Sequence, residues 1–424
     1  MIITRPGRAL VGLAVAALLA GCGSDSGSTA ATNAPATSAA PTAVPTASDA
    51  PAPTDAPAST DAPSSTDAPA ATDAPETTGA GGDVVDLASV CPNPIVVQTD
   101  WYPSPEHGYL YSMIGADGSL DAKNGVYRGP LLGSNVDLEI RSGGPYLGYQ
   151  PTVAIMYQDP TILLGYDSLD SQVQQSGAFP TVSIMAPFAK NPQILMWNPE
   201  QYHFTSFADI GKSDATVLYF QGGVFMDYLV KNGMVREDQL DGSYDGAPAR
   251  FVADPKVVQQ GFATSEPYTY EHVIKDFMKP VDYLVIADSG YDIYSQTLSA
   301  RAEVMSDEAA CFKKLVPMVQ QAEVGFYADP APTNQVILDI VKQLDTSWVL
   351  DPGIMDYSAA TTLSGGFVAN GTDGAIGSMD PQRMIDMTDL LVGMMQGQDG
   401  VKPGLTATDL YTNEFIDPTI ALPG

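Results

Sequence analysis

The sequence predicts an α/β protein with two lobes, each built on a mainly parallel sheet that helices cover. Two observations support this fold class. From residue 94 onward, short apolar runs that suit strands alternate with helical patterns, and repeated β–α units of this kind form parallel sheets flanked by helices. The region from residue 84 to the end also holds about 340 residues, more than one such sheet usually needs.

Strands and helices are expected in a regular order up to about residue 290. A strand is expected where apolar and β-branched residues gather, and a helix where apolar residues recur with a helical period. The expected helix at 105–116 has Pro105 near its first turn, where proline is tolerated. The expected strands are 94–98, 135–144, 161–168, 181–188, 192–198, 213–220, 249–254, 261–266 and 281–291, and the further helices are 222–234 and 255–261.

After about residue 290 the pattern becomes mostly helical. Residues 294–307, 308–330 and 333–344 each repeat apolar residues at a helical spacing. The C-terminal part has glycine-rich turns and one strong helical pattern at 380–397. This region is therefore expected to add helices rather than strands.

The first 21 residues have the pattern of a signal peptide. Arg5 and Arg8 precede a short apolar run that ends in small residues, and the run is too short for a stable membrane span. The segment LAGC at 19–22 resembles a bacterial lipobox, in which cleavage precedes Cys22 and lipid is attached to it. This predicts an extracytoplasmic protein anchored to the cell membrane by lipid. The alternative is an ordinary secreted protein with a chance cysteine near the cleavage site.

Residues 22–83 are expected to form a disordered tether. They are almost entirely Ala, Pro, Thr, Ser, Asp and Gly, and the unit TDAP recurs four times with a period of six. Such a segment has too few large apolar side chains to form a core. Frequent proline favours extended conformations, so the tether would reach on the order of 100 Å from the membrane.

The chain is strongly acidic, with a formal net charge of −31. Residues 84–424 hold 17 Lys and Arg against 42 Asp and Glu, which leaves −25 for this region. Nucleic-acid binding is therefore not expected, because it needs Lys and Arg to neutralise phosphates. A surface that keeps the protein soluble explains the charge.

Three cysteines are present, and Cys22 is assigned to lipid. Cys91 and Cys311 remain, and two such residues outside the cell pair more often than they stay free. A Cys91–Cys311 disulfide is therefore predicted, with two buried thiols or intermolecular pairing as alternatives. A count of free thiols in the denatured, unreduced protein distinguishes these cases.

Four loops follow expected strands, at residues 98–108, 165–172, 219–224 and 264–270. In open α/β sheets, ligands bind at the carboxyl ends of the strands. Rings offer stacking area at a low cost in side-chain entropy, and carboxylates accept hydrogen bonds from amino groups or pair with cations. The candidate ligand-binding residues in these loops are Asp100, Trp101, Tyr102, Glu106, His107, Asp167, Ser168, Gln221, Gly222, Gly223, Glu266 and Tyr268.

In this order the four loops resemble those of ABC-importer solute-binding proteins, in the group that includes sulfonate, nitrate and thiamine-pyrimidine-precursor receptors. The strongest match is VVQTDWYPSPEHGYLY at 96–111, which is similar to the family's strand, D-W-Y/F-P-x-x-E-H motif and helix. Weaker matches are 123–144, 165–175 and 259–268. The resemblance covers roughly residues 93–350.

The resemblance implies a two-lobed periplasmic-binding-protein fold of type II. The first lobe would be residues 84–193 plus 290–424 and the second residues 194–289, with 192–198 and 281–291 as the crossover strands of a hinge. It also implies a monomer that passes a small-molecule ligand to a permease and its ATPase, with no cofactor or metal. The segment Asp117–Asp121 and the long tail after Asp351 depart from the family pattern.

The acidic and aromatic loops favour a nitrogen-bearing, flat ligand such as a pyrimidine-like ring. Nitrate and sulfonate are disfavoured, because they would need Arg, Lys or many N–H donors. A receptor for these anions is kept as the alternative. A sensor without a transport role is another. An enzyme is not expected, because no H-x-x-x-H, C-x-x-C or G-x-S-x-G pattern is present. His203 and His272 are interpreted as packing or solvated residues.

Overall fold

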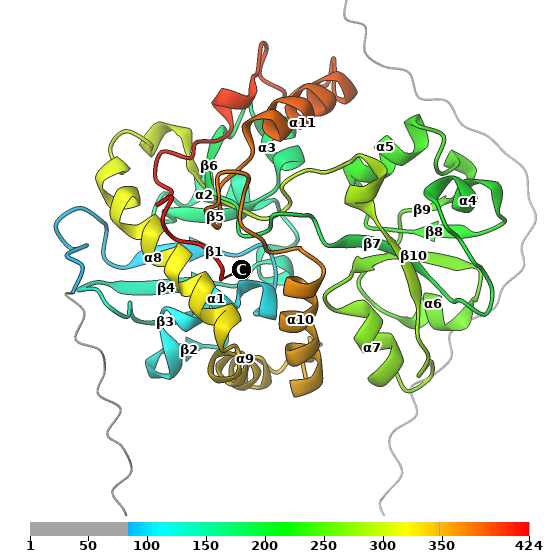
Figure 1. Cartoon of the computed structure of the whole chain (residues 1–424), viewed down its shortest axis with the longest axis horizontal. Coiled ribbons are helices and arrows are strands. Elements are labelled where there is room, and N and C mark those ends of the chain that lie inside the picture. The colour runs from blue at the N-terminus through cyan, green and yellow to red at the C-terminus, as the bar shows by residue number, and fades with distance from the viewer. Residues whose placement is uncertain (1–83, 347, 424) are drawn as a thin grey trace, which may run out of the picture. The chain divides into compact units, whose positions relative to one another are not determined.

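A computed structural model describes residues 84–346 and 348–423, so the predicted signal peptide, Cys22 and the whole predicted tether lie outside the described residues. The described chain is an α/β protein with two sheets (Figure 1). Strands between residues 95 and 185, together with 297–301, form the first sheet, and strands between 193 and 285 form the second. No described helix is both long and apolar enough to cross a membrane.

The first sheet has seven strands with β1 at its centre. All four residues of β1 are buried, as expected for a strand covered on both faces. β1 pairs in parallel with β4 and β5, so Val97 lies beside Ile140 on one side and Leu164 on the other. In order across the sheet, the strands are β2 (Ser119–Asp121), β3 (Val126–Pro130), β4 (Asp137–Arg141), β1 (Ile95–Gln98), β5 (Leu164–Asp167), β12 (Thr297–Arg301) and β6 (Thr181–Met185).

The second sheet has five strands with β10 at its centre. Its strands β7 and β11 are the two segments expected as crossovers, and they pair antiparallel, with Leu195 beside Leu284. The chain therefore leaves the first sheet before β7 and returns to it after β11. In order, the strands are β11 (Asp282–Val285), β7 (Gln193–Trp197), β10 (Val257–Phe262), β8 (Thr216–Leu218) and β9 (Leu240–Asp241).

Helices surround both sheets, and the longest, α8, packs beside α1. A side chain at Gly108 of α1 would lie 2.2 Å from the ring of Phe326 in α8, so glycine permits the close approach. A short 3₁₀ turn, η1 (Pro105–His107), leads into α1. The helices are α1 (Gly108–Ser112), α2 (Thr152–Gln158), α3 (Leu169–Gln175), α4 (Phe207–Lys212), α5 (Val224–Lys231), α6 (Ala249–Ala253), α7 (Glu266–His272), α8 (Ala309–Ala328), α9 (Ala331–Leu344), α10 (Pro352–Ser364) and α11 (Pro381–Met394).

The two-sheet α/β architecture confirms the predicted fold class. The strand directions are more mixed than expected, with six antiparallel and four parallel pairs. β12 contributes two antiparallel pairs, because the chain returns from the second sheet and inserts between β5 and β6. The lobe boundaries at 193/194 and 289/290 stay a prediction.

Four local predictions of secondary structure are wrong, one of them the strand at 261–266, of which only Gly261 and Phe262 are in a strand. Residues 249–253 form α6 rather than a strand, and 257–262 form β10 rather than a helix. β10 is flanked by β7 and β8, and pairing on both sides outweighs the local preference of its two glutamines. Residues 297–301 form β12 rather than a helix, because the buried hydroxyls of Thr297 and Ser299 lie 2.8 and 3.1 Å from that of Ser183.

Cys91 and Cys311 are joined by a disulfide in the structure, with their Cα atoms 4.8 Å apart. The pairing is the one predicted. It links the segment before β1 to the first turn of α8, across 220 residues of sequence. The covalent state of the purified protein is checked by the thiol count described above.

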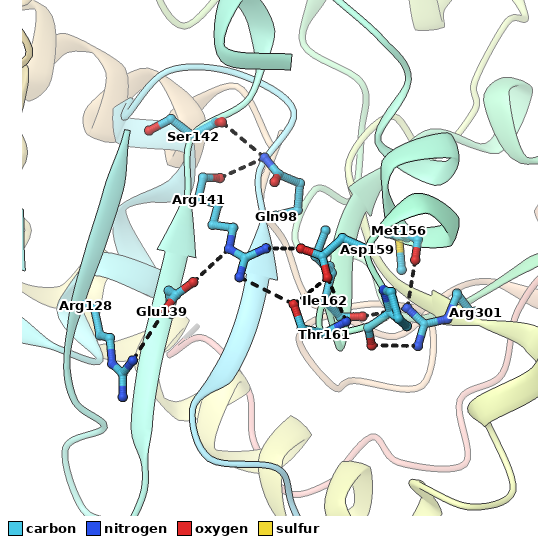
Figure 2. A network of polar contacts seen from close by, with 11 residues as sticks. Gln98, Arg128, Glu139, Arg141, Ser142, Met156, Asp159, Thr161, Ile162 and Arg301 are labelled. Carbon is cyan, nitrogen blue, oxygen red and sulfur yellow. Dashed lines mark hydrogen bonds and ion pairs between the residues drawn. The ribbon is translucent and has the colours of Figure 1, made fainter. Parts of the chain in front are cut away.

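Polar contacts tie the strand ends of the first sheet to the neighbouring loops (Figure 2). Arg301 donates to the carbonyl oxygens of Met156 and Ile162 at 2.9 and 2.8 Å, so it satisfies one backbone acceptor in the last turn of α2 and one in the loop that follows. At the other end of the sheet, the side-chain amide of Gln98 donates to the carbonyl oxygens of Arg141 and Ser142 at 3.0 and 3.1 Å. These bonds fix the end of β1, from which the candidate site begins.

Candidate functional site

A cavity of about 670 Å³ takes its walls from loops of both sheets. This volume is within the usual range for small-molecule sites, about 300–1,000 Å³. The residues that line it are Asp100, Trp101, Tyr102, Ser104, Pro105, Glu106, Pro145, Tyr149, Phe220, Tyr244, Asp245, Gly246, Ala247, Pro248, Gln260, Gly261, Phe262, Thr264, Ser265, Glu266, Gln296, Trp348, Leu350, Ile354 and Ser358.

The loop after β1 supplies one wall, and its backbone is fixed by a glycine turn after β4. Gly143 and Gly144 donate their N–H groups to the carbonyl oxygens of Trp101 and Asp100, at 2.8 and 2.9 Å. A side chain at Gly143 would lie 2.2 Å from the carbonyl oxygen of Thr99. The glycine pair therefore allows the two loops to touch and sets the direction of Trp101.

Aromatic rings converge on Trp101. The ring centroids of Tyr102, Phe220 and Trp348 lie 6.0, 6.4 and 6.2 Å from that of Trp101, all near edge-to-face. Tyr102 also stacks on Trp348, with the ring planes 9° apart. These rings come from both sheets and from the segment between α9 and α10, and they form an apolar surface suited to a flat or cationic ligand.

Tyr149 lines the cavity, and the residue is 61% exposed. Its ring centroid lies 6.1 Å from that of Trp101. Its φ angle is +60°, in the left-handed region that non-glycine residues adopt at a cost. An exposed aromatic ring held in such a backbone conformation beside a cavity is a candidate ligand contact.

Asp100 is held by two partners, His107 behind the cavity wall and Gln296 within it. Its Oδ1 lies 2.9 Å from Nε2 of His107, and its Oδ2 accepts from Gln296 at 3.2 Å. His107 is completely buried, and its Nδ1 lies 3.3 Å from the hydroxyl of Ser104. His107 therefore orients Asp100 and does not itself face the cavity.

Glu106 and Glu266 are half-buried carboxyl groups that reach the cavity from different sheets. Glu106 Oε1 accepts from the hydroxyl of Thr264 at 2.7 Å, a bond that crosses between the two walls. Glu266 Oε2 accepts from the backbone N–H of Phe262 at 2.7 Å. Burial raises the pKa of both groups, that of Glu266 to about 7, and the charge on Glu106 adds to the rise at Glu266.

The second sheet contributes Phe220 after β8 and Tyr244 after β9. Their ring centroids lie 4.7 Å apart. Gln260 of β10 fixes the backbone at Phe220, because its side-chain oxygen accepts from the N–H of Phe220 at 3.0 Å. Gln259, buried beside it, donates to the hydroxyls of Tyr244 and Tyr270 at 3.2 and 2.9 Å.

Five of the predicted ligand-binding residues lie together in the cavity wall: Asp100, Trp101, Tyr102, Glu106 and Glu266. They come from loops 98–108 and 264–270. That they bind a ligand stays a prediction, but the shared cavity that it requires is present.

The other predicted site residues are outside the cavity lining. Asp167 is buried, accepts from the N–H of Ser168 at 2.8 Å and from Thr181 at 3.1 Å, and Ser168 precedes the first turn of α3. Tyr268 packs against the ring of Tyr357 of α10, at 5.5 Å. Gln221, Gly222 and Gly223 form the turn before α5, with Gly222 at a φ of +89°.

Several wall residues are missing from the sequence prediction, among them Tyr149, Phe220, Tyr244, Gln260 and Trp348. Phe220 directly precedes the predicted Gln221–Gly223 turn, so this loop reaches the cavity through a neighbouring residue. Trp348 has no local motif, and the resemblance ends at about residue 350. Within the described part of the chain, no group of three or more His, Cys, Asp or Glu is arranged to hold a metal ion.

No protein-family model matches the sequence, and no curated protein matches it either. Solved structures with a similar arrangement include the zinc-bound ligand-binding component of an ABC-type import system from Staphylococcus aureus. It is 11% identical, with a TM-score of 0.45, over 76% of this chain and 97% of the other.

Two further structures are the nitrate-binding protein NrtA from Synechocystis PCC 6803 and the aliphatic sulphonate binding protein SsuA from Escherichia coli. The first is 12% identical with a TM-score of 0.44, over 76% of this chain and 87% of the other. The second is 10% identical with a TM-score of 0.40, over 64% and 93%. Because these TM-scores are below 0.5, the function proposed below rests on the chain's own residues.

Proposed function

We propose that this protein is the extracytoplasmic solute-binding component of an ABC importer, anchored to the membrane by lipid on Cys22. Its ligand is a small nitrogen-bearing molecule, for example a pyrimidine-like ring, held between two lobes. The observation that carries this proposal is one cavity with walls from both sheets. A ligand that contacts both walls stabilises the closed arrangement over the open one, and no chemical step is required.

The proposed lobes are residues 84–193 plus 290–424, and residues 194–289. The Glu106–Thr264 bond and a bond from the Tyr357 hydroxyl to the carbonyl oxygen of Ala263, at 3.1 Å, already join their walls. In the proposal, the closed monomer docks on a permease, and the ATPase supplies the energy for release. Permease and ATPase genes beside this gene would separate import from a sensor role.

The residue types of the cavity wall support a nitrogen-bearing ligand. Carboxylates accept hydrogen bonds from N–H groups, and rings stack on planar groups. The described lining residues include no Lys, Arg or His, whereas a sulfonate or nitrate receptor would use such donors. An anion receptor is therefore the less favoured reading, and an extracytoplasmic enzyme is a further alternative.

Native mass spectrometry of the purified protein tests the proposal. The expected result is one small molecule per chain, lost on partial denaturation, and a smaller radius of gyration by X-ray scattering when it is added back. Trp101→Ala is expected to lose the bound molecule, while Tyr283→Ala, which removes a ring of β11 outside the cavity, keeps it. A protein that carries no ligand and does not close with nitrogen heterocycles or alkylsulfonates would contradict the proposal.

A further inference from the structure

We infer that the cavity takes an organic cation, held between Glu106 of one wall and Glu266 of the other and surrounded by aromatic rings. The inference rests on the proposed function and narrows its ligand class from nitrogen-bearing molecules in general to positively charged ones. An amidinium group or a protonated heterocycle has the required chemistry.

The first step in the argument is the charge of the wall. Its described residues include four acidic side chains and no basic one. Two of the acids have other roles: Asp100 is held by His107 and Gln296, and the exposed Asp245 accepts from the N–H of Ala247 at 3.0 Å.

Glu106 and Glu266 are left without a cationic partner. Each accepts one hydrogen bond from a neutral donor, Thr264 Oγ1 or Phe262 N–H, and no described Lys, Arg or His lies within ion-pair distance of either. A pair of half-buried carboxyl groups that repel one another is costly to ionise without a counter-charge. A cationic ligand that contacts both walls supplies this counter-charge.

The rings around the carboxyl pair point to the same ligand. Trp101, Tyr102, Phe220, Tyr244 and Trp348 all line the cavity, and the faces of aromatic rings attract cations. An anion would face both the carboxylates and these electron-rich faces. Ring and carboxyl groups therefore select for one sign of charge, and they do so from both walls.

The experiment compares three flat probes of nearly equal shape: benzamidinium, benzamide and benzoate, which carry charges of +1, 0 and −1. Isothermal titration calorimetry on the unaltered protein should give an affinity for benzamidinium at least 10-fold above that for benzamide, with no measurable heat for benzoate. Glu266→Gln and Glu106→Gln should each weaken benzamidinium about 10-fold and change benzamide less than 2-fold. Glu271→Gln, on the same helix as Glu266 but outside the cavity lining, is the matched control and should change neither.

Benzoate binding as tight as benzamidinium binding would overturn the inference, as would an affinity for benzamidinium that neither glutamine variant changes. Benzamide or benzoate binding that Trp101→Ala abolishes would leave the proposed solute-binding function standing while the cation is rejected. No binding of any probe, together with no co-purified molecule, would reject both. If one glutamine variant fails to fold, as judged by circular dichroism, the other variant and the probe series decide the matter.

Discussion

Trp101 is the residue at which the two walls of the cavity meet, because its ring neighbours include Tyr102 of its own loop and Phe220 of the second sheet. The glycine turn at 143–144 holds the backbone on which it stands. A ring in this position has lost its conformational freedom before the ligand arrives, so ligand stacking on it costs little entropy.

Trp101→Ala is therefore expected to weaken benzamidinium binding by about 10-fold or more, because one ring contact of about 1–2 kcal/mol is lost. Titration calorimetry measures the change. Trp101→Phe should recover part of the affinity, because it restores a ring face. An unchanged affinity in Trp101→Ala would assign the ring to packing between the walls.

Tyr149 allows the cost of a strained backbone to be measured. Its φ of +60° penalises every residue with a Cβ, whereas glycine adopts it freely. Both Tyr149→Gly and Tyr149→Ala remove the ring, but only Tyr149→Gly relieves the strain. Tyr149→Gly is expected to be about 0.5–1 kcal/mol more stable than Tyr149→Ala in urea unfolding, with equally weakened ligand binding. Equal stabilities would show that the backbone relaxes without cost.

At the scale of the elements, α11 holds the two segments by which the chain passes between the sheets. Arg383 donates to the carbonyl oxygens of Ala189, Asp292 and Ile293, the last two at 2.7 and 3.0 Å. Its guanidinium carbon lies 3.8 Å from the ring centroid of Tyr294. A single side chain from the C-terminal region thus fastens both connections.

Arg383→Gln is expected to lower the free energy of unfolding by about 2–3 kcal/mol, since hydrogen bonds to a largely buried charged group are lost. X-ray scattering of the ligand-free variant should show a larger radius of gyration if these segments form the hinge. Arg250→Gln removes an exposed ion pair with Asp241 and serves as the control, with a change of at most about 1 kcal/mol. Equal unfolding curves for the two variants would show that Arg383 of α11 does not stabilise the two connecting segments.

Gly353 sets the contact between α10 and α7. A Cβ at this position would lie 1.7 Å from the hydroxyl of Tyr268. Gly353→Ala should therefore destabilise the protein by about 1–3 kcal/mol through overpacking, and adding Tyr268→Ala should recover most of the loss. Gly325→Ala in α8, where a Cβ meets nothing within 4 Å, is the control and should raise stability by up to about 1 kcal/mol. Thermal unfolding measures all four proteins.

Elements with strong local patterns could be predicted, and elements set by long-range pairing could not. β1 is a run of buried residues, and α11 repeats buried apolar residues such as Met384 and Leu391 at a helical spacing. Both patterns are visible in a short window of sequence. β12 instead places Thr297 and Ser299 between β5 and β6, where Ser183 of β6 satisfies their hydroxyls. That partner is more than 100 residues away, so no local window contains the reason for the strand.

For the whole molecule, two carboxyl groups predict how stability depends on pH: Asp167, which is buried, and Glu266, which is half-buried. Burial raises the pKa of Asp167 and Glu266 to about 7 in the folded protein, whereas both are near 4 when unfolded. Between about pH 4 and 7 the folded state therefore binds more protons, and the free energy of unfolding must fall as pH rises through this window. The hydrogen bond from Ser206 lowers the pKa of Asp209 to about 2. This group therefore changes the free energy of unfolding mainly below about pH 4 and does not oppose the trend between pH 4 and 7.

The ligand-free protein is accordingly expected to melt at a higher temperature at pH 5 than at pH 8, by the equivalent of about 1–3 kcal/mol for each group. Differential scanning calorimetry across this range measures the difference. Asp167→Asn should reduce it, because an amide has no proton to lose. A melting temperature that rises from pH 5 to pH 8 would contradict the assignment.

The part of the candidate site that lies in one short run of sequence, the loop at 98–108, could be predicted. Asp100, Trp101, Tyr102 and Glu106 follow a buried strand, so their shared location follows from the α/β rule for ligand sites. The wall opposite depends on how distant segments pack. Trp348 reaches the cavity because its indole N–H donates to the carbonyl oxygen of Pro103 at 3.0 Å, a contact that no sequence pattern reveals.

The order of the strands along the chain determines which of the two sheets can be completed first during synthesis. β7 to β11, which make the entire second sheet, emerge from the ribosome before β12, so the gap between β5 and β6 stays unfilled for more than 100 residues of synthesis. Tyr411, which bridges to Ser183, arrives later still. A nascent chain halted in this interval would expose unpaired strand edges, open to invasion by a neighbouring copy.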